Sequence, residues 1–202
     1  KLLESFGGTP YVCVNKSFES FIPSKIKRKL AEKILNISLK ILKKDSSKHD
    51  KIEFQVIPNC LDFNFYKWKK IYLDNGINKD EIKIIENNFK IINSKSQNIF
   101  VQNLKKIELN EKINLKYSIS KKFSIIKLLQ ICRNTYTLIF SHFARCAFIS
   151  VIVLKSALEN KKISKKEYNN FFNSIETVSK NFQVDTNKFN NNEISKKILS
   201  KK

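Results

Sequence analysis

The chain has 202 residues, of which 42% are hydrophobic and 28% charged, and it carries a formal net charge of +21. This hydrophobic content suffices for a folded core, so the composition excludes a chain that is disordered over most of its length. The sequence contains no methionine, and we expect it to be an internal segment of a longer protein.

The positive charge consists almost entirely of lysine, since only Arg28, Arg133 and Arg145 are arginines. Specific nucleic-acid recognition relies on arginine forks, and single-strand binding relies on aromatic residues interleaved with the charge. Neither pattern occurs, so we expect a solvated lysine-rich surface and no specific nucleic-acid partner. The alternative is a free-standing basic helical protein that binds nucleic acid or scaffolds a partner. If the first interpretation holds, any nucleic-acid affinity is non-specific and falls as salt rises.

The first half of the chain predicts short strands and amphipathic helices. Glycines and a proline at positions 7–10 indicate a turn, and residues 11–15 are β-prone. Apolar residues recur every three or four positions over residues 25–44, which predicts a helix. Residues 52–56 alternate between apolar and polar, which predicts a strand. A second helix is expected at residues 79–92, opened by Asn78 with Glu81 three residues later as its cap, and a weaker helical signal covers 93–121.

The second half of the chain predicts helices only. The helical pattern at 123–158 exceeds the usual length, so we expect a break near residues 134–137. Ser164 and Glu167 fit a capping box that opens another helix. We expect this helix to bury a stripe formed by Tyr168, Phe171, Ile175, Val178 and Phe182.

The predicted fold class is therefore mainly α with one or two short β-strands. We expect a central helical domain over residues 1–186 and a polar lysine-rich tail over 187–202. The apolar run 138–154 contains His142 and Arg145 near its middle, where charge in lipid is costly, so it predicts a buried helix rather than a membrane span.

The four cysteines include no C-x-x-C pair. This spacing predicts free thiols in a cytoplasmic protein and no metal site. Three glycines cannot form a phosphate-binding loop, so we expect no cofactor in this segment. We also expect no membrane partner.

Two polar clusters contain the histidines. The first comprises His49, Asp50 and Glu53, followed by Asp62. One interpretation is a turn with a solvated carboxylate; the other is a substrate-binding site formed by His49, Glu53 and Asp62. In the second cluster His142, Arg145 and Cys146 stand at i, i+3 and i+4, so they share one helix face. There Arg145 either pairs with a carboxylate such as Glu53 or Asp62, or binds the phosphate or carboxylate of a substrate beside His142. The residues identify no catalytic group.

Five sequence blocks occur in a characteristic order: FGGTPYVCVN (6–15), SFESFIP (17–23), HDKIEF (49–54), HFARCAF (142–148) and SIETVSKNF (174–182). They resemble the region between the ATP-grasp lobe and the phosphohistidine domain of the phosphoenolpyruvate synthase and pyruvate phosphate dikinase family. The most similar branch is found in capsule and surface-polysaccharide gene sets and includes the capsular glutamine kinase. An acidic residue at Cys13 and a basic one at Asn15 would fit this pattern better.

The resemblance implies a helical connecting segment of a multidomain phosphotransferase. In such an enzyme, ATP and Mg²⁺ bound in the ATP-grasp lobe phosphorylate a histidine on a mobile domain, which passes the group to a small-molecule acceptor such as pyruvate. The resemblance makes the two missing domains the partners of this segment. It also implies that the segment alone is inactive, and that neither His49 nor His142 is the phosphorylated histidine.

Overall fold

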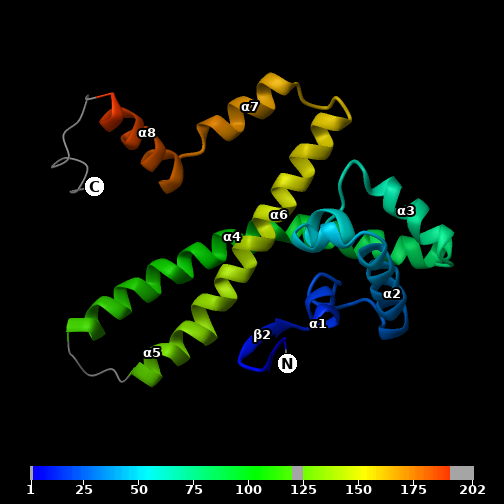
Figure 1. The fold of residues 1–202 in the computed structure, drawn as a ribbon, viewed down its shortest axis with the longest axis horizontal. Helices are drawn as coiled ribbons and strands as arrows, with labels where there is room; N and C mark the ends of the chain where they lie inside the picture. The colour runs from blue at the N-terminus through cyan, green and yellow to red at the C-terminus, as the bar shows by residue number, and fades with distance from the viewer. Residues whose placement is uncertain (1, 120–124, 192–202) are drawn as a thin grey trace. The chain divides into compact units, whose positions relative to one another are not determined.

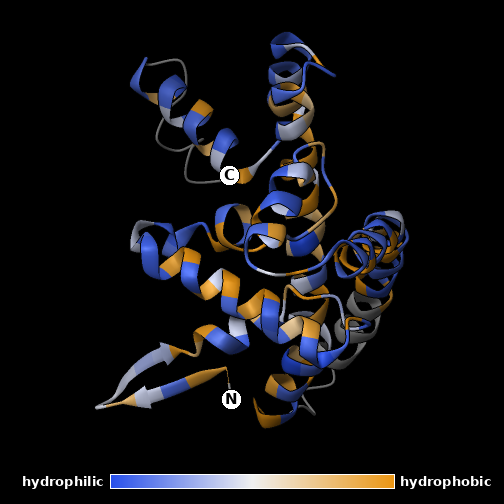
Figure 2. Ribbon diagram, turned by 90° about the vertical axis from the view of Figure 1, so that its right-hand side faces the viewer, coloured by the Kyte–Doolittle hydropathy of each residue, from blue (hydrophilic) through white to orange (hydrophobic). Residues whose placement is uncertain are grey.

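The computed structural model describes residues 2–119 and 125–191, and their side chains except those of 110–119. The chain divides into two units, Lys1–Ala157 and Leu158–Lys202. It is mainly α-helical, and its described part contains one two-stranded sheet, which agrees with the predicted fold class. Figure 1 shows the order of the elements along the chain. Hydrophobic and hydrophilic residues are interleaved along the helices (Figure 2).

The first unit begins with a β-hairpin. Strands β1 (Leu3–Phe6) and β2 (Thr9–Val12) pair antiparallel, with Phe6 opposite Thr9. Gly7 and Gly8 join the strands with φ of 57° and 82°, a left-handed conformation that glycine adopts without steric cost. The predicted strand at residues 11–15 ends early, because helix α1 (Val14–Glu19) begins two residues after β2.

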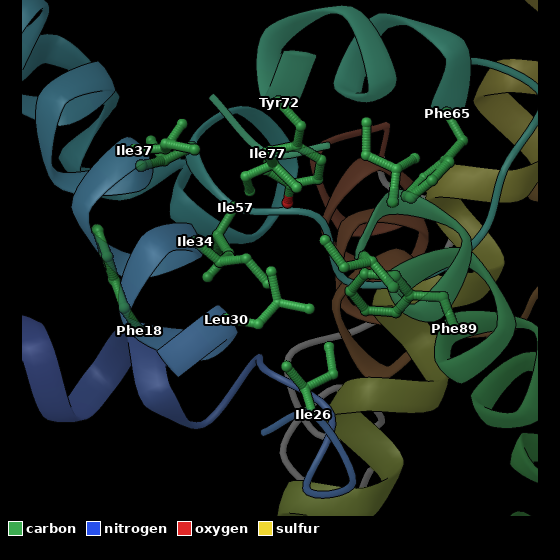
Figure 3. Close-up of a cluster of buried hydrophobic side chains, with 13 residues drawn as sticks. Phe18, Ile26, Leu30, Ile34, Ile37, Ile57, Phe65, Tyr72, Ile77 and Phe89 are labelled. Atoms are coloured by element: carbon green, nitrogen blue, oxygen red, sulfur yellow. The ribbon is translucent and has the colours of Figure 1, made fainter. Parts of the chain in front are cut away.

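Three helices surround the main hydrophobic core, which Figure 3 shows in close-up. They are α2 (Arg28–Lys44), α3 (Phe65–Asp74) and the first turns of α4 (Lys79–Ile119). The apolar stripe of α2 faces this core as its spacing predicts. The buried core residues are Phe18, Ile26, Leu30, Ile34, Ile37, Val56, Ile57, Phe65, Tyr72, Ile77, Ile82, Ile85 and Phe89.

Helix α4 begins with the cap that the sequence predicts. The amide of Glu81 donates to the side chain of Asn78 at 2.9 Å, and the Glu81 carboxylate accepts from the Asn78 amide at 3.1 Å. Glu81 also pairs with Lys33 of α2 at 2.6 Å. The weakly helical residues 93–121 continue the same helix as far as Ile119, and residues 120–121 lie outside the described part.

The strand predicted at residues 52–56 is wrong. This segment is a π-helical turn, η2 (Ile52–Val56), which follows a 3₁₀ turn, η1 (Ser46–Asp50). The amide of Ile57 donates to the carbonyl of Ile52 at 3.1 Å. Val56 and Ile57 are both fully buried, whereas neighbouring residues of a strand would point to opposite faces. Packing of both side chains into the core therefore favours the turn.

A long interrupted helix ends the first unit. It consists of α5 (Ile125–Ile131), a π-helical turn η3 (Cys132–Tyr136) and α6 (Thr137–Glu159). The irregular turn lies where the sequence predicts a break, and residues 123–124 lie outside the described part. By length and composition alone this run could cross a membrane, but so could the core helix of a soluble protein, and 11% of its most apolar window is buried. The prediction that residues 138–154 are buried is therefore wrong: Ile139 and Ile149 are buried there, and most of the others are not.

The second unit contains α7 (Lys165–Ser174) and α8 (Val178–Asn190). Ser164 and Glu167 form the predicted capping box at the start of α7. The predicted buried stripe is wrong, because Val178 and Phe182 are 87% and 69% exposed. The predicted stripe falls on two separate helices, because α7 ends at Ser174 and α8 begins at Val178. Of the predicted tail, residues 192–202 lie outside the described part.

Candidate functional site

A cavity of about 420 Å³ lies within the first unit. Three segments that are distant in sequence line it: the turn after α1, the middle of α4 and the middle of α6. Contacts between Asn103 and His142 and between Phe100 and Phe143 show that α4 and α6 pack together where they cross in Figure 1. Its lining residues are Ser20, Ile22, Pro23, Ser24, Lys25, Asn88, Ile91, Ile92, Lys95, Ser96, Ile99, His142, Arg145, Cys146 and Ile149.

Arg145 is the one arginine among the described residues that line this cavity. Its Nη1 donates to the main-chain carbonyl of Ser20 and its Nη2 to that of Phe21, each at 3.2 Å. The turn after α1 thus supplies two neutral acceptors. Of the two predicted alternatives for Arg145, pairing with the carboxylate of Glu53 or Asp62 is therefore wrong, because main-chain carbonyls accept its hydrogen bonds.

The third donor of Arg145 is unused. Its Nε atom is buried and makes no hydrogen bond. Burial also lowers the pKa of the guanidinium, because transfer from water disfavours its charged form. Carbonyl dipoles compensate a buried cation less well than a negative charge does. An anion that accepts from Nε would therefore lower the free energy of the site.

His142 and Cys146 lie on the same face of α6 as Arg145, as their spacing predicts, and all three line the cavity. Nδ1 of His142 lies 3.0 Å from the amide nitrogen of Asn103, a residue that is 3% exposed. In this arrangement the amide donates, which leaves the imidazole proton on Nε2. The Cys146 thiol donates to the carbonyl of Ser96 at 3.5 Å, and burial raises its pKa, which keeps the thiol neutral.

The cavity lining is cationic. Lys25 and Lys95 line the cavity together with Arg145, and no aspartate or glutamate is among the described residues that line it. Sequence reasoning identified neither lysine, because 39 basic residues give no signal that distinguishes two of them. A missing carboxylate and an unpaired buried donor are features of a site that holds an anion.

The first predicted cluster lies elsewhere. His49 is exposed in η1, where its Nδ1 atom lies 3.1 Å from the carbonyl of Ser46. Glu53 is partly buried in η2. Its neighbour Phe54 stacks edge-on against Phe148 of α6, with ring centroids 5.6 Å apart. Neither His49 nor Glu53 lines the cavity.

Asp62 lies in the loop before α3 and is partly buried. Burial raises the pKa of its carboxyl, and hydrogen bonds from the Asn64 backbone and the Ser156 hydroxyl oppose that rise. The Lys67 charge also opposes the rise, and Asp62 is absent from the cavity lining. The structure therefore brings together Arg145 and His142 but not His49, Glu53 or Asp62.

In the part of the chain that the structure describes, no group of three or more histidine, cysteine, aspartate or glutamate residues could hold a metal ion.

Comparison of the chain with protein-family models, curated proteins and solved structures finds no match.

Proposed function

We propose that the cavity around Arg145 binds a small molecule bearing a phosphate or carboxylate group. The observation that carries this proposal is the buried Nε donor of Arg145, which has no partner inside a cavity lined by cations. A guanidinium presents its donors in a planar fork, which matches the oxygens of both anionic groups. A ligand oxygen at Nε would complete the hydrogen bonding that Ser20 and Phe21 leave unfinished.

We further propose that the chain is the acceptor-side segment of an ATP-dependent phosphotransferase. The ordered sequence blocks that resemble the phosphoenolpyruvate synthase family support this, and the cationic cavity is compatible with an acceptor such as pyruvate. ATP, Mg²⁺ and the phosphorylated histidine belong to the partner domains, and the whole enzyme is cytoplasmic. On this proposal the segment positions the acceptor and does not itself transfer the phosphoryl group.

Titration of the chain with inorganic phosphate and with pyruvate, followed by the NMR amide shifts of α4 and α6, tests the anion site. Saturable shifts are expected for at least one of the two probes. Arg145→Gln should abolish them, and Lys95→Gln should weaken binding without affecting the fold, because Lys95 is exposed. Arg133→Gln is the matched control, since this arginine is also exposed and lies outside the cavity. Equal loss in the control, or no saturable shift with either probe, would reject the site.

A separate experiment tests the phosphotransferase proposal. The chain incubated with Mg-ATP should show neither saturable binding at micromolar nucleotide nor a phosphorylated histidine, because it lacks a glycine-rich phosphate loop. The longer protein should be labelled on a histidine outside residues 1–202. Phosphorylation of His49 or His142 would contradict the proposal that the phosphorylated histidine lies in a partner domain, whatever the outcome of the anion titration.

A further inference from the structure

A second feature, independent of the cavity, is an exposed apolar surface on α5 and the first turn of α6. We call it the α5 face. Its six large side chains are between 50% and 76% exposed, so no described element covers them. They are Ile125, Ile126, Leu128, Leu129, Leu138 and Phe140. Six large exposed apolar side chains within residues 125–140 of one helical run are unusual on a soluble surface and mark an interaction site.

The charge of the sequence that contains this face indicates what covers it. Residues 112–158 contain no aspartate or glutamate but include eight basic residues: Lys112, Lys116, Lys121, Lys122, Lys127, Arg133, Arg145 and Lys155. Of these, Lys127 and Arg133 are exposed on α5 and η3 themselves. Apolar side chains next to clustered cations are the pattern of a helix that rests on an anionic lipid surface.

The alternative occupants fit less well. A second copy of the chain would bring two molecules of +21 charge together, which repel each other. A membrane span fits poorly as well, because Arg145 is held by the carbonyls of Ser20 and Phe21.

We infer that the α5 face binds peripherally to a membrane surface that contains anionic lipids. The apolar side chains enter the boundary between headgroups and acyl chains, while Lys127 and Arg133 contact the headgroups. The segment beyond His142 stays packed against α4. This inference replaces the sequence-based expectation of no membrane partner, and it does not depend on the proposed anion site.

Vesicle flotation tests the inference with two compositions: phosphatidylcholine alone, and equal parts of phosphatidylcholine and phosphatidylserine. The chain should float with the mixed vesicles, and binding should weaken as salt rises. The double variant Ile126→Glu/Leu129→Glu should bind the mixed vesicles at least about tenfold more weakly, because it places charge where apolar surface must insert. Both residues are exposed, so circular dichroism should show an unchanged fold.

The matched control is Val178→Glu/Phe182→Glu, which adds the same charge at exposed apolar positions of α8. This control should float like the unmodified chain. Equal loss of vesicle binding in both variants would mean that net charge alone drives the binding. Unchanged binding of the α5 variant would mean that the apolar side chains of the α5 face do not contact the membrane. Either result overturns the inference. So would failure to float with mixed vesicles, or a self-association in sedimentation that Ile126→Glu/Leu129→Glu abolishes.

Discussion

Nη2 of Arg145 donates a 3.2 Å hydrogen bond to the main-chain carbonyl of Phe21, 124 positions earlier in the chain. Together with the bond from Nη1 to Ser20, this contact joins α6 to the turn after α1. One side chain thereby lines the cavity, holds the turn against α6 and keeps one buried donor unused. Arg145 therefore has a structural role in addition to the anion-binding role that we propose for it.

Replacement of Arg145 by methionine should lower the free energy of unfolding by about 1–3 kcal/mol, because the carbonyls of Ser20 and Phe21 lose their donors. Urea unfolding measures the difference. Arg133→Met, at an exposed position of η3, should change stability by less than about 0.5 kcal/mol. A stability of Arg145→Met equal to that of the unmodified chain would mean that water replaces the guanidinium at both carbonyls.

Tyr72→Phe should raise the free energy of unfolding by about 1 kcal/mol. The ring of Tyr72 lies in the core (Figure 3), and its fully buried hydroxyl makes no hydrogen bond. Removal of the oxygen abolishes its desolvation cost and leaves the ring packing intact. Tyr66→Phe, at a residue that is 58% exposed, is the control and should leave the thermal midpoint unchanged. Destabilisation by Tyr72→Phe would reveal a buried partner for the hydroxyl.

Cys60 should make stability depend on alkaline pH. Burial raises the pKa of its thiol from 9.0 to about 12, with the nearby Asp62 charge adding to the rise. The folded state thus keeps a proton that the unfolded state releases, so stability falls as pH rises from about 9 to about 12, at no more than about 1.4 kcal/mol per pH unit. Urea unfolding between about pH 8 and pH 10 should show a shallower decline for Cys60→Ala than for the exposed control Cys132→Ala. Parallel profiles for the two variants would contradict the prediction.

Ser164→Ala should destabilise the first turn of α7 by about 1 kcal/mol, because the Ser164 hydroxyl accepts from the Glu167 amide at 3.2 Å. Amide hydrogen exchange in that turn should therefore become several-fold faster. The control Ser174→Ala removes a hydroxyl at the other end of the same helix, where it donates to the carbonyl of Phe171. Acceleration in the first turn by both variants would indicate that α7 opens as a whole and not from its cap.

Local patterns predicted most of the helices. The regular apolar spacing of α2 and the capping residues Asn78 and Ser164 act within a few residues of one another, so their effects are visible in the sequence. The alternation at residues 52–56 misled because five residues are too few to distinguish a strand from a turn. The segment forms a turn because the consecutive side chains of Val56 and Ile57 both pack into the core.

The candidate site could be predicted only in part. The helical spacing of His142 and Arg145 placed them on one face, and this follows from local geometry alone. The acceptors of Arg145 are main-chain carbonyls, which every residue carries, so no residue type identifies Ser20 and Phe21 as its partners. Long-range packing of α6 against the turn after α1 selects them.

The π-helical turn η3 places five residues, Cys132–Tyr136, between the two halves of the long helix. A π turn contains about one residue more than an α turn, and each residue of an α-helix turns the chain by about 100°. Relative to an uninterrupted helix, α5 is therefore rotated by roughly that angle about the common axis. Deletion of a single residue from η3 would swing Ile126 and Leu129 around the axis while leaving Arg145 in place. The length of one turn thus sets the angular offset between the α5 face and the cavity.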